Sequence, residues 1–182
     1  MDYYKQIFKR KSFHIFKDIG KITEEEIQKL VLFIQTVKPL DVNIKTEICL
    51  VPEKETTCKR GGEYCILFYS EAKGEYLRNI GYMGEQIDLY LASQNIGALW
   101  FGIGKPQNMQ RNGLDYVIMI SIAKMPADKV RYYNKIDIGI FLFMLETCLE
   151  HENYVFERSL FEDTTDDSVE KILIAKYRNW IS

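Results

Sequence analysis

The chain has 182 residues, a formal net charge of −2 and a charged fraction of 27%. The length predicts one domain, and the balanced charge argues against a nucleic-acid ligand, which favours a strongly basic face or run. The chain shows no secretory signal and no apolar run as long as a membrane span, so we expect a cytoplasmic protein with no membrane partner. Its four cysteines lack CxxC spacing and it has only two histidines, so no metal site is expected.

The first half of the chain predicts two helices and two strands. Thr23 is followed by three glutamates and by apolar residues at helical spacing, which is typical of a capped helix that Pro39 then ends. Residues 64–69 form a continuous apolar run rich in aromatic and β-branched side chains, as in a central strand. The expected elements are helix 2–9, an extended stretch 10–18, helix 23–37, strand 46–51 and strand 64–69.

The second half predicts further helices around two apolar stretches. Residues 74–95 carry apolar side chains every three or four positions, and Gly97 suits the C-cap of such a helix. Gly81 and Gly84 lie inside this helix and suggest close approach of another backbone or of a ligand. The other expected elements are the apolar stretch 98–103, strand 116–123, helix 137–152 capped by Asp137, surface loop 162–167 and helix 168–181 capped by Ser168. Helices mixed with strands in this way indicate an α+β fold.

A short polar segment carries the first candidate site. Arg10, Lys11, Ser12 and His14 stand on a stretch that is expected to be extended, where alternate side chains share one face. Arginine, lysine and serine together offer a planar fork, a point charge and a hydroxyl donor to an anion such as a phosphate. The alternative is a solvated basic stretch that follows a helix.

A second constellation joins the helix containing Gly81 and Gly84 to the glycines that follow the stretch around Trp100. Glycines after that stretch, at Gly102 and Gly104, let backbone N–H groups approach a ligand, although helix packing explains the helical glycines equally well. The sequence contains no P-loop, no GxGxxG after a strand, no GxSxG and no HExxH. Any enzymatic activity would therefore depend on a bound cofactor.

Taken in order, these segments resemble the nitroreductase family, and especially a clostridial-type subgroup. The resemblance covers most of residues 4–160. It is carried by residues 10–14 with Phe16, by the helix start at 22–25, by the stretch 81–102 with Trp100, by 69–71 and 84–91, and by 136–140. It implies a nitroreductase-like, mainly antiparallel mixed sheet flanked by helices, in a single domain over residues 1–182.

The resemblance also implies a function and a set of site residues. Family members bind FMN without a covalent bond and usually form homodimers. They pass electrons from NADPH or NADH to nitro compounds or quinones by a ping-pong mechanism, so the expected partner is a small-molecule substrate. Carried over, Arg10, Lys11, Ser12 and His14 would hold the FMN phosphate, ribityl chain or pyrimidine edge. Ser70 would lie near the flavin ring, and the backbone of Gly102 and Ile103 would approach its redox-active nitrogen.

Two features depart from the family pattern. His14 stands where the family commonly has Arg or Lys, so its charge depends on pH. A segment that follows the strand 116–123 in the family looks shortened here, near residues 124–135, with Lys129 and Arg131 as weak substitutes for a basic pair. The alternative to an active oxidoreductase is a nitroreductase-like protein that binds a flavin or another ligand without turnover. A third alternative is a structural or regulatory partner protein with no cofactor.

Overall fold

The computed structural model describes residues 3–7, 10–17, 20–125, 143, 145–147, 149–151, 154–160 and 175–179. The chain divides into two compact units, Met1–Arg131 and Tyr132–Ser182. The prediction of one domain over residues 1–182 stays a prediction. Most of the segment near 124–135 that looks shortened lies outside the described residues, as do Lys129 and Arg131.

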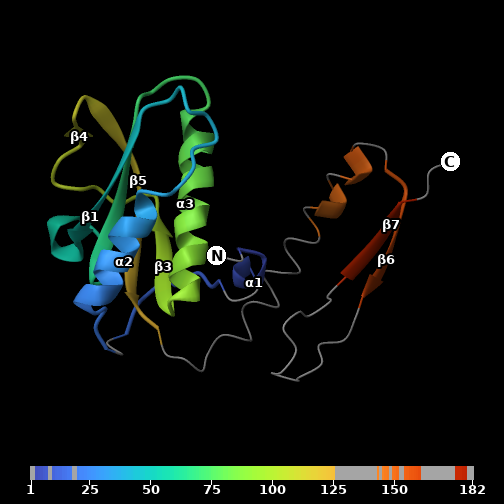
Figure 1. Cartoon of the computed structure of the whole chain (residues 1–182), viewed down its shortest axis with the longest axis horizontal. Helices are drawn as coiled ribbons and strands as arrows, with labels where there is room; N and C mark the ends of the chain where they lie inside the picture. Colours follow the sequence, from blue (N-terminus) through green and yellow to red (C-terminus); the bar gives the residue numbers. More distant parts are fainter. Residues whose placement is uncertain are drawn as a thin grey trace. The chain divides into compact units, whose positions relative to one another are not determined.

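A five-stranded antiparallel sheet forms the centre of the first unit (Figure 1). Its strands follow the order β1-β2-β5-β3, and a short β4 pairs with β5 at its start. The sheet confirms the predicted strands 46–51, 64–69 and 116–123, and the apolar stretch 98–103 lies mostly in β3. The strand bounds are β1 Thr46–Pro52, β2 Tyr64–Ser70, β3 Ile96–Phe101, β4 Gln110–Arg111 and β5 Leu114–Lys124.

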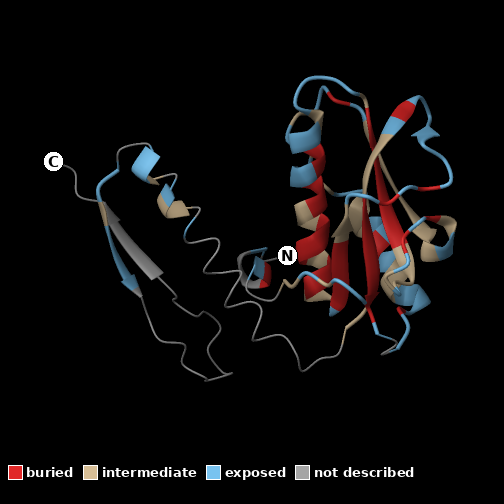
Figure 2. Ribbon diagram, turned by 180° about the vertical axis from the view of Figure 1, so that it is seen from behind, coloured by how far each residue is buried: buried red, intermediate tan, exposed pale blue. Residues whose placement is uncertain are grey.

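Two helices, α2 (Glu24–Ile34) and α3 (Tyr76–Ser93), cover one face of this sheet. Alternate residues of the central strands point toward the helices because side chains of a strand alternate between its faces. In Figure 2 the buried surface runs along the strands and along the inner side of α3. The core between the layers includes Leu30, Ile66, Phe68, Ile80, Ile87, Leu91, Ile120 and Ile122.

The opposite face of the sheet carries two smaller apolar clusters. One contains Leu67, Tyr69 and Met119 from the central strands. The other contains Leu99 of β3 and Phe16, with Phe13 packed against it. The segment before α2 therefore covers this face next to β3. A short 3-10 helix, η1 (Glu53–Glu55), follows β1 in the connection to β2.

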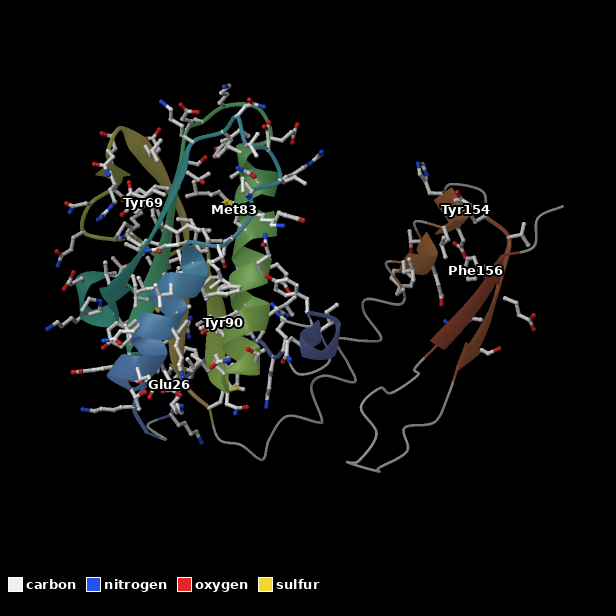
Figure 3. All side chains as sticks on the ribbon, in the orientation of Figure 1. Glu26, Tyr69, Met83, Tyr90, Tyr154 and Phe156 are labelled. Atoms are coloured by element: carbon white, nitrogen blue, oxygen red, sulfur yellow. The ribbon has the colours of Figure 1, made fainter. Side chains whose placement is uncertain are left out.

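The N-terminus of α2 confirms the predicted capping box. The Thr23 hydroxyl accepts from the Glu26 N–H at 3.2 Å, and the Glu26 carboxylate accepts from the Thr23 N–H at 2.9 Å. Glu26 also forms an ion pair with Lys124 of β5, which joins the cap to the sheet and lowers the pKa of Glu26. Figure 3 labels Glu26 at this end of α2, and farther along the chain it labels Tyr90 of α3, whose ring stacks on Phe33 with centroids 4.0 Å apart.

The predicted C-cap at Gly97 is wrong, because α3 ends earlier. Gln94 is the C-cap, and Asn95 takes the left-handed conformation, with a φ of 55°. Asparagine tolerates this conformation better than most residues, so the turn needs no glycine. Gly97 lies inside β3, opposite Ala123 of β5. The short helix α1 (Tyr3–Ile7) confirms the helix expected at 2–9 and contacts α3.

The second unit corrects the predicted final helix 168–181. Its residues Ala175–Asn179 form the strand β7, which pairs antiparallel with β6 (Phe156–Leu160). The strand conformation of these residues depends on pairing with β6, which the local sequence pattern does not indicate. Residues 143, 145–147 and 149–151 are helical, within the predicted helix 137–152. Asp137, Ser168 and the loop 162–167 lie outside the described residues.

Candidate functional site

The segment that carries the predicted cationic site runs along the edge strand β3. Ser12 and Ala98 form a parallel bridge, and the Phe13 N–H donates to the Ala98 carbonyl at 3.2 Å. This pairing places the segment at an edge of the sheet, where Phe13 and Phe16 pack on the face opposite the helices. Arg10 and Lys11 are partly buried there, whereas Ser12 and His14 are exposed.

A buried carboxylate on α3 holds Arg10. Asp88 is 2% exposed, and its Oδ2 accepts from Arg10 Nε at 2.9 Å and from Trp100 Nε1 at 2.8 Å. A buried carboxylate needs such charge-assisted donors to offset its loss of water. Asp88 thus connects three elements: the N-terminal segment, α3 and β3. Sequence reasoning missed this residue, although a carboxylate four positions after Gly84 and three before Leu91, on the apolar face of a helix, was the available signal.

Glu85, one helical turn before Asp88, is the second acid near Arg10. Its Oε1 lies 3.6 Å from Arg10 Nε, and its side chain is 47% exposed. Loss of hydration around the carboxyl group raises the pKa of Glu85 to about 7, with Arg10 opposing this rise and the charge of Asp88 adding to it. The charge beside Arg10 therefore changes near neutral pH.

Glu85 should make the stability of the protein depend on pH. Between its ordinary value of 4.5 and about 7, the folded chain binds more protons at Glu85 than the unfolded chain does. Stability from this group is therefore lost as the pH rises through that window. We expect the melting temperature to fall more between about pH 5 and about pH 8 in the wild type than in Glu85→Gln. Equal falls in the two proteins would show that Glu85 titrates normally.

The two glycines inside α3 have different surroundings. A Cβ added to Gly84 would lie 2.2 Å from Cη2 of Trp100, whereas a Cβ added to Gly81 would meet nothing within 4 Å. Gly84 therefore admits the indole ring that bonds Asp88. The sequence predicted close approach of another backbone or of a ligand at Gly84, whereas the structure places the Trp100 side chain there.

Alanine substitutions at these two glycines should have opposite effects on stability. Gly84→Ala should lower the free energy of unfolding by about 2 kcal/mol, because the Trp100 ring must move. Gly81→Ala, in the same helix, should raise it by about 0.5–1 kcal/mol, because glycine is a poor helix former. Denaturant unfolding measures the change in the free energy of unfolding of each variant. A destabilised Gly81→Ala or an unaffected Gly84→Ala would refute the packing described here.

The exit of β3 is open to solvent. Gly102 follows the strand, and a Cβ added there would meet nothing within 4 Å. Ile103 is 80% exposed, which leaves an apolar side chain beside an accessible backbone. The predicted residues Gly102 and Ile103 are thus at the end of the strand that Ser12 pairs with. A flat apolar group could contact this exit.

Ser70 stands apart from the other predicted site residues. It ends β2, is 1% exposed, and its hydroxyl donates to the carbonyls of Lys45 and Glu71 at 3.3 and 3.0 Å. Strand β5 lies between β2 and β3 in the sheet. The structure therefore groups Arg10, Lys11 and Ser12 along β3, with Gly102 and Ile103 at its end, whereas the Ser70 hydroxyl is engaged toward β1.

A family model described as "Putative TM nitroreductase" matches residues 2–138 of this chain. The chain therefore belongs to the nitroreductase family. No curated protein matches it.

Solved structures with the same fold have low sequence identity to this chain. A nitroreductase family protein from Clostridium difficile 630 is 12% identical, covers 69% of this chain and 85% of its own, and gives a TM-score of 0.55. An FMN-dependent nitroreductase from Clostridium difficile R20291 is 16% identical, with coverage of 71% and 91% and a TM-score of 0.53. A protein from Desulfovibrio desulfuricans solved in complex with FMN is 13% identical, with coverage of 70% and 88% and a TM-score of 0.50. These likenesses confirm the predicted fold, an antiparallel sheet flanked by helices.

Two features are absent from the residues that the structure describes. No described helix combines the length and the apolar character that crossing a membrane requires. In the same part of the chain, no three histidine, cysteine or acidic side chains are grouped as metal ligands.

Proposed function

We propose that this protein is an FMN-dependent oxidoreductase that transfers electrons from NADPH or NADH to nitro compounds or quinones. Membership of the nitroreductase family supports the redox class, and the solved relatives described as FMN-dependent or in complex with FMN support the cofactor. Cytoplasmic location and a homodimer belong to the same proposal. The observation that carries it is the cationic segment paired along β3, the strand whose open end carries Gly102.

The residues along β3 fit the chemistry of FMN. Two cations and an exposed hydroxyl, from Arg10, Lys11 and Ser12, suit a phosphate dianion. At the end of the same strand, Gly102 leaves its backbone accessible, and Ile103 offers apolar contact to a flat ring. When bound, FMN would supply two-electron transfer from NADPH or NADH to the acceptor, in a ping-pong order.

In this proposal, residues of the chain bind the phosphate of FMN and orient its ring system. Arg10 and Ser12 would contact the phosphate, with Arg10 directed by Asp88. His14 is exposed and would approach the polar edge of the ring system. The Gly102 N–H would donate a hydrogen bond to the ring, since glycine leaves the approach to its backbone open. Ser70 stays a predicted contact, although its hydroxyl proton is engaged by the carbonyls of Lys45 and Glu71.

Turnover is the direct test of this function. We expect the protein, supplied with FMN, to oxidise NADPH or NADH in the presence of a nitroarene or a quinone. Protein without FMN serves as the control. Flavin binding without NADPH or NADH oxidation would instead favour the alternative of a nitroreductase-like binding protein. Absence of both flavin binding and oxidation would overturn the proposal.

A further inference from the structure

A short loop before β2 is fixed against the sheet and against the N-terminal segment. The Arg60 carbonyl accepts from the Phe16 N–H at 2.7 Å, and the Glu63 N–H donates to the Ile122 carbonyl of β5 at 2.8 Å. Between them, the Gly62 N–H donates to the Glu53 carboxylate at 3.0 Å. These bonds anchor the backbone on both sides of the loop.

Two glycines allow the loop to lie this close. Gly61 has a φ of 81°, and a Cβ there would lie 2.7 Å from the Phe16 carbonyl oxygen. A Cβ on Gly62 would lie 2.2 Å from the Ser121 hydroxyl. The loop backbone therefore has little freedom, and the position from which the Arg60 side chain starts is fixed.

Arg60 carries its cation to the exit of β3. Its Cζ lies 5.6 Å from the centre of the Phe101 ring, and Phe101 directly precedes Gly102. A guanidinium over an aromatic ring is held in place while its N–H groups can still donate to an anion. Among the described residues, no carboxylate forms an ion pair with Arg60.

We propose that Arg60 determines specificity by binding an anionic group, a carboxylate or a phosphate, of the substrate that occupies the exit of β3. This inference rests on the proposed function, because it assigns the substrate class to the same site. The planar guanidinium fork matches carboxylate and phosphate oxygens, and the neighbouring Phe101 and Ile103 provide apolar contact for the rest of the molecule. Arg60 thus favours a substrate that carries such an anionic group over a neutral analogue.

Equilibrium binding of matched probes tests this assignment. Purified protein is titrated with 4-nitrobenzoate and with neutral 4-nitrobenzyl alcohol, without reductant, and quenching of protein fluorescence gives both dissociation constants. We expect Arg60→Gln to raise the ratio of the anionic to the neutral dissociation constant about 10-fold, because a charge-assisted hydrogen bond is lost. Arg60→Lys should raise the ratio less, since it keeps the charge. Lys59→Gln removes a neighbouring exposed cation and should leave the ratio unchanged.

Kinetic measurements distinguish the two sources of the anion. A selective fall of kcat/KM for 4-nitrobenzoate in Arg60→Gln would identify an acceptor carboxylate, whereas a selective fall for NADPH would identify a phosphate of the electron donor. An unchanged ratio of dissociation constants together with unchanged kcat/KM for both substrates overturns the inference. The proposed function fails separately, if the wild type neither binds flavin nor reduces 4-nitrobenzyl alcohol. In that event the titrations of wild type and Arg60→Gln alone decide the role of Arg60.

Discussion

Replacing Asp88 by alanine should lower the free energy of unfolding by about 3 kcal/mol, the largest stability effect that we expect from one side chain here. The carboxylate is buried and accepts from both Arg10 Nε and Trp100 Nε1. Without it, the indole N–H beside α3 loses its acceptor, and Arg10 loses the carboxylate oxygen that lies 2.9 Å from its Nε. Denaturant unfolding measures the loss.

Two other variants test whether this loss comes from the hydrogen bonds that Asp88 accepts from Arg10 and Trp100. Asp88→Asn retains an acceptor oxygen and should lose about half as much stability, since one donor can still be satisfied. Asp115→Ala removes an exposed aspartate bonded to Gln110 and should change stability by about 0.5 kcal/mol or less. If Asp88→Ala were as stable as Asp115→Ala, Asp88 would not connect the three elements in solution.

The double variant Arg10→Ala/Ser12→Ala should weaken FMN binding about 100-fold. It removes a charge-assisted contact and a hydroxyl contact to the phosphate, and these together correspond to roughly that loss. Riboflavin lacks the phosphate, so its affinity should change much less. Flavin fluorescence quenching gives both dissociation constants, and the ratio of the two separates a lost phosphate contact from a general loss of packing.

Arg78→Ala is the matched control for this prediction. Arg78 is a cation on α3 whose side chain is 76% exposed and pairs with Glu75. Its removal changes the net charge of the protein by the same amount as removal of Arg10. An equal effect of Arg78→Ala on FMN affinity, or equal losses of FMN and riboflavin affinity in the double variant, would refute a phosphate site at Arg10 and Ser12.

Much of the first unit could be predicted from local pattern. Thr23 and Glu26 stand at capping-box spacing, and the cap forms as expected. Strands β2 and β5 are long apolar runs whose residues are mostly buried, so composition alone indicates them. Helix α3 follows from its apolar spacing, although the predicted range 74–95 exceeds the observed Tyr76–Ser93 by two residues at each end. The C-cap was misplaced because Asn95 supplies the left-handed turn that a glycine commonly supplies.

Tertiary partners explain what the sequence could not predict. The strand β7 depends on pairing with β6, which no pattern within 175–179 announces. Asp88 gains its role from Arg10, 78 positions earlier in the chain, and from Trp100. The candidate site was predicted through resemblance to a family, and the structure groups most of its residues along β3 while the Ser70 hydroxyl is engaged elsewhere.

Flavin binding by the wild-type protein tests the central claim most directly. Flavin-free protein is titrated with FMN and, separately, with riboflavin, and the absorbance at about 450 nm follows the bound flavin. We predict that FMN binds at least about 10-fold more tightly than riboflavin, because only FMN places a phosphate at the cationic segment beside β3. Equal affinity for the two flavins, or no binding of either, would contradict the account.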